Sequence, residues 1–286
     1  MTDFPIQIRP SDCDSYGHVN NAIYVSYFQQ ALADGLTRRG CGNDWRTEGE
    51  YRWEPQTLHL EYRRPATYGE NLEARLWLAQ PDRIHPGFGF DLRSNPAAGG
   101  DPAPVVFRAL GIWTRKQRKN DALCEINREV LEDFSSESGA LPRGFEAPAA
   151  IASAREYRRE RIVELGEVDP TGFVHPQALF QWFEESIHDA SAQAGWPLAR
   201  WLAAGVFTLQ TRHDAEIFTL PRGGDTVQIA SRLIDARRLG GTWLIEVHRS
   251  SNHQLLARDF STGVHLNLEG RPTAPPAQII QDIQNG

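Results

Sequence analysis

The chain repeats itself at an offset of 155 residues, and this repeat limits its possible architecture more than any other feature. The stretch "CDSYGHVNNAIYVSYF" at residues 13–28 aligns without a gap with "VDPTGFVHPQALFQWF" at residues 168–183. The same offset pairs acids, glycines and apolar residues along both halves: Asp14 with Asp169, Gly17 with Gly172, Val19 with Val174, Gly40 with Gly195, Glu61 with Glu216 and Gly69 with Gly224. Solenoid repeats are much shorter, roughly 20 to 50 residues. The pattern therefore predicts a duplicated domain.

The segment between the copies has the composition of a linker. Residues 135–154, "SSESGALPRGFEAPAAIASA", are rich in Ser, Ala, Gly and Pro and lack a sustained apolar period. We therefore expect a first domain at residues 1–134 and a second at residues 155–286, each of ordinary domain size.

Each copy shows one strand, a loop, one long helix and four further strands. Apolar residues recur at helical spacing over residues 21–39, and Gly40 follows as a stop signal; residues 179–190 have the same spacing before Gly195. Period-two alternation predicts strands at residues 4–9, 57–63, 72–78, 87–93 and 105–113, and at 157–165, 215–220, 226–233, 242–249 and 257–266. The sequence thus predicts an α+β fold in which each repeat packs a long helix against an antiparallel sheet.

Charge and cysteine content exclude several classes of protein. A net charge of −7 argues against a nucleic-acid binder, although a local cluster of Lys and Arg can still hold a small anion. The three cysteines, Cys13, Cys41 and Cys124, form neither a zinc motif nor a disulfide framework, which indicates a reducing compartment. No signal peptide and no apolar run of membrane length is visible. We therefore expect a cytoplasmic protein without nucleic-acid or membrane partners.

The polar stretch at residues 12–23 does not fit the common ligand-binding loops. As a calcium loop it would place Tyr16 and Ile23 where oxygen ligands are needed. The chain contains no G-x-S-x-G elbow and no H-E-x-x-H zinc motif, and "GFGFDL" at residues 87–92 lacks the third glycine of a dinucleotide loop. We therefore expect neither a metal site nor a cofactor.

Residues 12–21 have the pattern D-x-D-x-x-G-H-V-N-N and precede an aromatic-rich helix. This pattern resembles the hotdog-fold thioesterases. The "DCD" and the second copy's "VDPTGFV" are similar to the 4-hydroxybenzoyl-CoA thioesterase group, whereas "HVNN" is similar to the acyl-carrier-protein thioesterases. The resemblance implies a hotdog fold, in which a sheet wraps a central helix, built twice in tandem as a double hotdog.

Thioester hydrolysis needs an activated water or a nucleophile, and a donor for the developing oxyanion. A loop carboxylate can meet the first need, and the unpaired N–H groups at a helix start can meet the second. By resemblance, Asp14 takes the position of the catalytic acid, and the backbone N–H of Asn21 polarises the carbonyl. His18 and Asn20 would orient the acid or the water, and Gly17 would lie with Asn21 at the substrate.

Local structure explains several of these residues as well. Asn20 or Asn21 can simply cap the helix. Gly17 suits a turn that requires positive φ, and His18 can bond to the backbone. Both explanations stay open at the level of sequence.

The second copy departs from this pattern. Asp169 keeps the acid and is a second catalytic candidate, but Phe173 replaces the histidine, and Pro176 stands where Asn21 stands in the first copy. Proline has no N–H to donate, although it is also common at the first position of a helix. We therefore predict two unequal sites, of which the one built on Asp14 is the better catalyst.

Two further groups of ionisable residues follow. Glu184, Glu185 and His188 on the second helix either face the active site or form the polar face of an amphipathic helix. A basic cluster at the end of the last strand of copy one could bind the phosphates of coenzyme A, or be a solvated strand end: Arg115, Lys116, Arg118 and Lys119.

Together these observations predict an acyl-CoA thioesterase whose substrate is a small acyl thioester and which uses no cofactor, CoA being part of the substrate. An acyl-carrier-protein thioesterase is the alternative that "HVNN" favours, and a non-catalytic acyl-CoA binder has the same fold expectation. A homodimer or larger homo-oligomer is compatible with exposed sheet edges.

Overall fold

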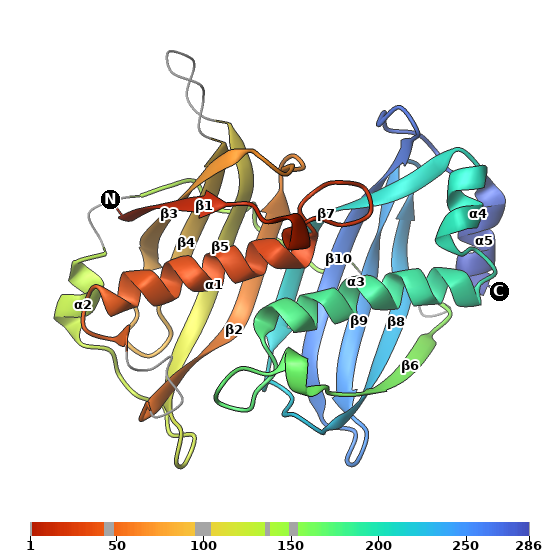
Figure 1. Ribbon diagram of the computed structural model, residues 1–286. Coiled ribbons are helices and arrows are strands. Elements are labelled where there is room, and N and C mark those ends of the chain that lie inside the picture. The colour runs from red at the N-terminus through yellow and green to blue at the C-terminus, as the bar shows by residue number, and fades with distance from the viewer. Residues whose placement is uncertain (1, 43–48, 95–103, 135–137, 149–153, 286) are drawn as a thin grey trace. The chain divides into compact units, whose positions relative to one another are not determined.

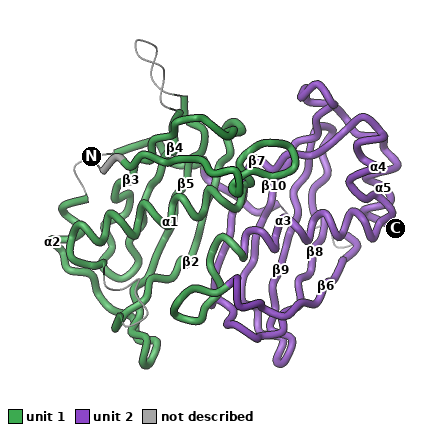
Figure 2. The backbone as a smooth tube through the Cα atoms, in the orientation of Figure 1, with its two compact units in different colours: residues 1–143, 168–178 green, residues 144–167, 179–286 purple. Residues whose placement is uncertain are grey.

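The computed structural model describes residues 2–42, 49–94, 104–134, 138–148 and 154–285. The chain forms two compact units (Figure 2): unit 1 comprises residues 1–143 and 168–178, and unit 2 comprises residues 144–167 and 179–286. The loop before the second long helix is thus grouped with unit 1. The expected domain limits at 1–134 and 155–286 remain predictions, and the expected linker lies partly outside the described residues.

Unit 1 consists of one long helix lying across an antiparallel sheet (Figure 1). The strands follow the order β1-β3-β4-β5-β2. The helix α1 (Asn21–Thr37) is preceded by the short 3-10 turn η1 (Pro10–Asp12), and α2 (Arg128–Glu132) follows the sheet. The strand bounds are β1 Thr2–Gln7, β2 Tyr51–Tyr62, β3 Asn71–Gln80, β4 Gly87–Ser94 and β5 Val105–Gln117.

Unit 2 has the same organisation, with strands in the order β7-β10-β9-β8-β6. Its long helix is α3 (Pro176–Gln193), whose first three residues are grouped with unit 1. The other elements are β6 Tyr157–Ile162, η3 Leu165–Glu167, α4 Leu198–Ala203, β7 Val206–Ile217, β8 Thr226–Arg237, β9 Gly240–Arg249, β10 Leu255–Asn267 and α5 Ala277–Asn285.

The core of unit 1 is aromatic and lies between α1 and the sheet. Phe28 stacks on Phe90 with ring centroids 5.0 Å apart, and Tyr24 stacks on Phe107 at the same 5.0 Å. Trp113 meets Phe28 edge-on and is 1% exposed. The apolar face that the sequence predicts for this helix is therefore the face that packs on the sheet.

The strands of both units carry β-bulges at matching positions. Gln56 on β2 and Thr211 on β7 are each skipped in the strand pairing, and so are Ala79 on β3 and Ile234 on β8. Each pair is separated by the same 155 residues that relate the two sequence copies. Bulges are local features that families conserve, so the duplication extends to irregular details of the backbone, and it fixes which residues correspond between units.

The predicted α+β double arrangement is confirmed. The structure differs from the prediction at element ends and in the shorter helices α2, α4 and α5, which were not predicted. Strands β2 and β7 begin at Tyr51 and Val206, well before the predicted starts at residues 57 and 215. The alternation fails there because a bulge interrupts each strand and because polar residues such as Glu54 are buried. None of the described helices combines the length and the apolar character that crossing a membrane requires.

Candidate functional site

The Asp14 loop is a tight turn closed by its own carboxylate. The backbone N–H of Asp14 donates to the His18 carbonyl at 2.8 Å, and its Oδ1 accepts from the N–H groups of Tyr16, at 2.8 Å, and His18, at 3.4 Å. Gly17 has a φ of +76°, which an L side chain rarely adopts. Both of these side-chain hydrogen bonds use Oδ1. The other carboxylate oxygen, Oδ2, has no hydrogen-bond partner among the described residues and is therefore available to a water or a substrate.

The helix start follows directly and is capped by Asn20. The Asn20 side chain accepts from the Ala22 N–H at 3.0 Å, and its backbone N–H donates to the Asp12 carbonyl at 2.9 Å. Asn21 is the first residue of α1, and its carbonyl accepts from the Tyr62 hydroxyl at 3.2 Å. Its N–H, one of the orphan donors of a helix start, has no partner among the described residues. The capping role considered for Asn20 is thus observed.

Buried tyrosines hold this loop and helix start in place. The Tyr27 hydroxyl donates to the Asp12 carboxylate at 2.8 Å, and burial together with this carboxylate raises the pKa of Tyr27. The Tyr24 hydroxyl accepts from the Ala66 N–H at 3.1 Å, and burial raises the pKa of Tyr24 to about 12. Both phenols therefore remain protonated and act as fixed donors and acceptors around the turn.

The second copy builds the same turn around Asp169. Its N–H donates to the Phe173 carbonyl at 2.8 Å, and its Oδ1 accepts from the Thr171 N–H at 2.7 Å, from the Thr171 hydroxyl at 2.5 Å and from the Phe173 N–H at 3.4 Å. Gly172 repeats the positive φ, at +82°. Pro176 is the first residue of α3, so this helix start lacks the N–H that Asn21 offers.

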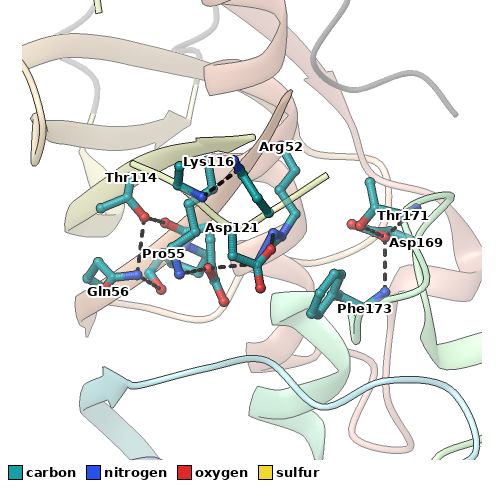
Figure 3. A network of polar contacts seen from close by, with 12 residues as sticks. Arg52, Pro55, Gln56, Thr114, Lys116, Asp121, Asp169, Thr171 and Phe173 are labelled. Atoms are coloured by element: carbon teal, nitrogen blue, oxygen red, sulfur yellow. Dashed lines mark hydrogen bonds and ion pairs between the residues drawn. The ribbon is translucent and has the colours of Figure 1, made fainter. Parts of the chain in front are cut away.

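The residue that replaces the motif histidine in copy two has a structural partner in unit 1. The Arg52 guanidinium lies 4.2 Å from the centroid of the Phe173 ring. Arg52 also donates to Asp121 at 2.8 Å (Figure 3). It donates to Glu54 at 3.3 Å, and Glu54 additionally accepts from Lys116. Arg52 is 5% exposed and Glu54 is fully buried. The Asp169 loop therefore packs on a buried ionic network of β2 and β5.

The basic cluster predicted for coenzyme A lies on this same hairpin. Lys116 contacts Glu54, the Arg115 guanidinium lies 3.8 Å from the Tyr51 ring centroid, and Arg118 donates to the Tyr51 carbonyl at 2.8 Å. Lys119 is exposed beyond the end of β5. Three of the four side chains thus have intramolecular partners that fix their positions.

A second ionic cluster, which the sequence reading missed, lies in unit 2. His213 on β7 and Asp259 on β10 are fully buried and joined by a 2.7 Å hydrogen bond, and Glu184 on α3 lies 3.8 Å from the histidine. The sequence contains one indication of this cluster: the repeat aligns His213 with the apolar Leu58, so an ionisable residue stands at a position that is apolar in the first copy. Its neighbour Glu185 instead pairs with arginines of β6, on the polar face of α3.

In the part of the chain that the structure describes, no three His, Cys, Asp or Glu side chains are arranged to hold a metal ion. The site residues predicted from the sequence lie in three parts of the structure. Gly17, His18, Asn20 and Asn21 surround Asp14 in one loop, Asp169 lies in the matching loop, and the basic residues lie on β5 and just beyond its end.

Part of the chain matches known thioesterases in sequence. Residues 8–131 match the family model of the "Thioesterase-like superfamily". The long-chain acyl-CoA thioesterase FadM of Escherichia coli (strain K12) is 32% identical over 75 residues, which cover 26% of this chain and 56% of the relative. This chain therefore spans little more than half the length of that curated relative.

Solved structures match over nearly the whole chain, at identities that show the fold alone. A protein of Lactobacillus plantarum provisionally named an oleoyl thioesterase aligns with a TM-score of 0.71 at 13% identity, over 96% of this chain and 97% of that one. An acyl-ACP thioesterase of Bacteroides thetaiotaomicron VPI-5482 aligns with a TM-score of 0.69 at 11% identity, over 91% and 96%. Residues 8–131 are therefore similar to the thioesterase-like superfamily, and the fold of the chain is that of the tandem, double hotdog structures.

Proposed function

We propose that this chain is an acyl-CoA thioesterase in which Asp14 and the start of α1 act on the thioester. The observation that carries the proposal is the Asp14 loop. Its Oδ1 closes the turn, its Oδ2 has no hydrogen-bond partner within the described residues, and the Asn21 N–H is likewise unpaired there. A carboxylate and an orphan donor in one short loop are the two groups that thioester hydrolysis needs.

The reaction follows from these two groups. The Asp14 carboxylate takes a proton from a water that attacks the acyl carbon, or attacks that carbon itself to give an anhydride that water then opens. The N–H of Asn21, at the positive end of the α1 dipole, stabilises the oxyanion. The C–S bond then breaks. On the first route the departing thiolate takes the proton that Asp14 holds; on the second route it takes a proton from solvent, and water afterwards opens the anhydride to release the acid and restore Asp14. Gly17 and His18 shape the turn around the acid.

Other observations support an acyl-CoA substrate. The family match includes the Asp14 loop, and the matched relative in E. coli is named a long-chain acyl-CoA thioesterase. Arg115, Lys116, Arg118 and Lys119 would attract the phosphates of coenzyme A. Asp169 would serve a weaker second site, since Pro176 removes the donor there.

Substitution of Asp14 by Asn tests the proposal, because Asn keeps the Oδ1 acceptor that closes the turn and removes only the charge. We expect kcat/KM for acyl-CoA hydrolysis to fall by about 100-fold or more, the usual contribution of a general base. The matched variant Asp169→Asn should lose far less. Thiol release would be followed over a panel of acyl-CoA substrates. An Asp14→Asn enzyme as fast as the wild type would remove Asp14 from the mechanism.

An acyl-carrier-protein thioesterase is the second candidate, because the "HVNN" string of residues 18–21 is similar to that branch. One acyl group presented on CoA, on a carrier protein and on a short thiol without phosphates separates the two. A lower KM for CoA than for the short thiol supports both the CoA assignment and the basic cluster. Heat protection by acyl-CoA without turnover of any substrate would instead identify a binding protein.

A further inference from the structure

Asp12 is the residue at which three segments of unit 1 meet. Its Oδ2 accepts the Arg9 N–H at 2.9 Å and the Tyr27 hydroxyl at 2.8 Å. Its carbonyl accepts the Asn20 N–H at 2.9 Å. Asp12 thus joins the chain before the Asp14 loop, the end of that loop and the second turn of α1.

These contacts fix the Asp14 carboxylate relative to the start of α1. Asp14 follows Asp12 by two residues, and Asn21 directly follows Asn20. The hydrogen bond between Asp12 and Asn20 therefore closes the loop at its base and constrains the carboxylate relative to the Asn21 N–H. In an enzyme, a displacement of about 1 Å between acting groups can slow the reaction roughly 100-fold. The contact that holds Asp12 in place thus controls how these two groups are placed.

The second copy builds the same contact from different residues. Glu167 and Trp182 lie 155 residues after Asp12 and Tyr27. The Trp182 Nε1–H donates to Glu167 Oε1 at 2.8 Å. Glu167 Oε2 accepts the N–H of the residue three positions earlier at 2.9 Å, as Asp12 Oδ2 does. The contact is therefore a feature of both copies, although neither of its two residue types is kept.

The two replacements compensate in length. Glutamate is one methylene longer than aspartate, and an indole N–H lies nearer its backbone than a phenol O–H does. In unit 1 a short acid meets a long donor, and in unit 2 a long acid meets a short donor. Both donors are buried, with Tyr27 7% and Trp182 1% exposed. Apolar pairs can replace such contacts at little cost, so a directional hydrogen bond in both copies points to the geometry that it imposes.

Unit 1 depends on its aromatic donor more than unit 2 does. In unit 2 the Arg161 guanidinium also pairs with Glu167. Ile6 stands at the corresponding position of unit 1, so Asp12 lacks that partner. Burial and the hydrogen bond to Asp12 raise the pKa of Tyr27. The phenol therefore keeps its proton at neutral pH and remains a donor.

Resting on the proposed thioesterase function, we propose that Asp12 and Tyr27 are positioning residues of the hydrolysis. Their hydrogen bond holds the base of the Asp14 loop on α1, so that the Asp14 carboxylate and the Asn21 N–H act on one thioester together. Both residues work through Asp14 and Asn21 and not on the substrate itself. Their loss therefore slows the chemical step and leaves substrate binding almost unchanged.

The variant Tyr27→Phe tests this role, because it removes the donor and keeps the ring. We expect kcat for acyl-CoA hydrolysis to fall at least about tenfold, with KM within about twofold of the wild type. The matched control is Trp182→Phe, which removes the equivalent donor of the second copy and should keep kcat within about threefold. Both variants are assayed well below their unfolding midpoints. An unchanged kcat in Tyr27→Phe, or an equal loss in Trp182→Phe, would overturn the inference.

Exchanging the whole contact between the copies provides a rescue. Asp12→Glu and Tyr27→Trp should each slow hydrolysis, because the acid and the donor no longer match in length. The double variant Asp12→Glu/Tyr27→Trp reproduces the pair of unit 2 and should be at least about fivefold faster than either single variant. A double variant no faster than the single variants would overturn the inference, since the hydrogen bond would then count for no more than ordinary packing.

Amide hydrogen exchange tests the same contact without substrate. The Asn20 N–H should exchange at least about tenfold faster in Tyr27→Phe than in the wild type, because its acceptor Asp12 is released, whereas amides in the middle of α1 keep their rates. An unchanged Asn20 rate would overturn the inference. If the wild type releases thiol from no thioester, the proposed function fails and the positioning role fails with it. An active wild type with a fully active Tyr27→Phe variant removes the positioning role alone.

Discussion

At the scale of single residues, Arg52 explains why the second copy departs from the motif of the first. Its side chain is 5% exposed, and its guanidinium contacts Asp121, Glu54 and the ring of Phe173. A cation over an aromatic face is attractive, more so when it is shielded from water. The phenylalanine that replaces the motif histidine thus anchors the Asp169 loop. The weaker catalysis expected there stays a prediction.

Removing the Arg52 charge should destabilise the protein strongly. In Arg52→Met the buried Glu54 loses a partner and Phe173 loses its cation, so we expect the free energy of unfolding to fall by about 3 kcal/mol or more. The control is Arg128→Met, which removes an exposed pair with Glu132 on α2 and should cost at most about 0.5 kcal/mol. Urea unfolding of both variants measures the difference. Equal losses would contradict the importance of the buried network.

The sequence predicted the Asp14 turn well because the turn is local. Its acid, its glycine and its cap lie within a few residues, and each residue type has a defined conformational preference. The networks of Arg52 and His213 were not predictable in this way. A charged residue in a strand is normally assigned to solvent, and here its burial depends on partners such as Asp121 and Asp259 that are distant in sequence.

At the scale of elements, the turns before α1 and α3 depend on a glycine with positive φ. Gly172 has a φ of +82°, and nothing lies within 4 Å of where its Cβ would be. Any penalty for a side chain there therefore comes from the backbone conformation and not from crowding. The helices themselves were predictable from apolar spacing, whereas the early halves of β2 and β7 were hidden by their bulges.

Substitution of Gly172 separates these causes. We expect Gly172→Ala to lower the free energy of unfolding by about 1 to 2 kcal/mol, and Gly172→Asn to cost clearly less, because asparagine tolerates the left-handed region. Gly144→Ala is the control, since Gly144 is equally open but lacks a positive φ, and its effect should stay within about 0.5 kcal/mol of zero. Thermal unfolding provides the comparison. A harmless Gly172→Ala would show that the turn relaxes to another conformation.

At the scale of the whole molecule, two buried histidines should set opposite limits on stability with pH. Burial lowers the pKa of His265, on β10, to about 4, and its ring lies 2.9 Å from the Thr208 hydroxyl and stacks on Trp201. Because this folded pKa lies below the unfolded value of about 6.5, its contribution is present above pH 6.5 and is lost as the pH falls toward 4. His213, with its pKa raised to about 10, contributes below pH 6.5 and loses that contribution as the pH rises toward 10.

The unfolding midpoint should therefore be highest near neutral pH and fall on both sides, with each histidine changing the free energy of unfolding by about 1 to 3 kcal/mol over its range. His265→Gln should flatten the acid side. The double variant His213→Leu/Asp259→Ala should flatten the alkaline side. It copies Leu58 and Ala109, which occupy the matching register positions of β2 and β5 in unit 1. Scanning calorimetry from pH 4 to pH 10 gives both slopes. Unchanged slopes in the variants would assign the pH dependence to other groups.

The paired bulges at Gln56 and Thr211 have an evolutionary consequence. When a protein assembles from two identical subunits, every mutation appears twice and both partners must tolerate it. In a fused duplicate, each half can change independently. A bulge retained in both halves keeps corresponding side chains on the same face of the strand while their amino acids diverge. Each half therefore shows which residues the same backbone position accepts in the other half, and residues can be exchanged between the halves to engineer the protein.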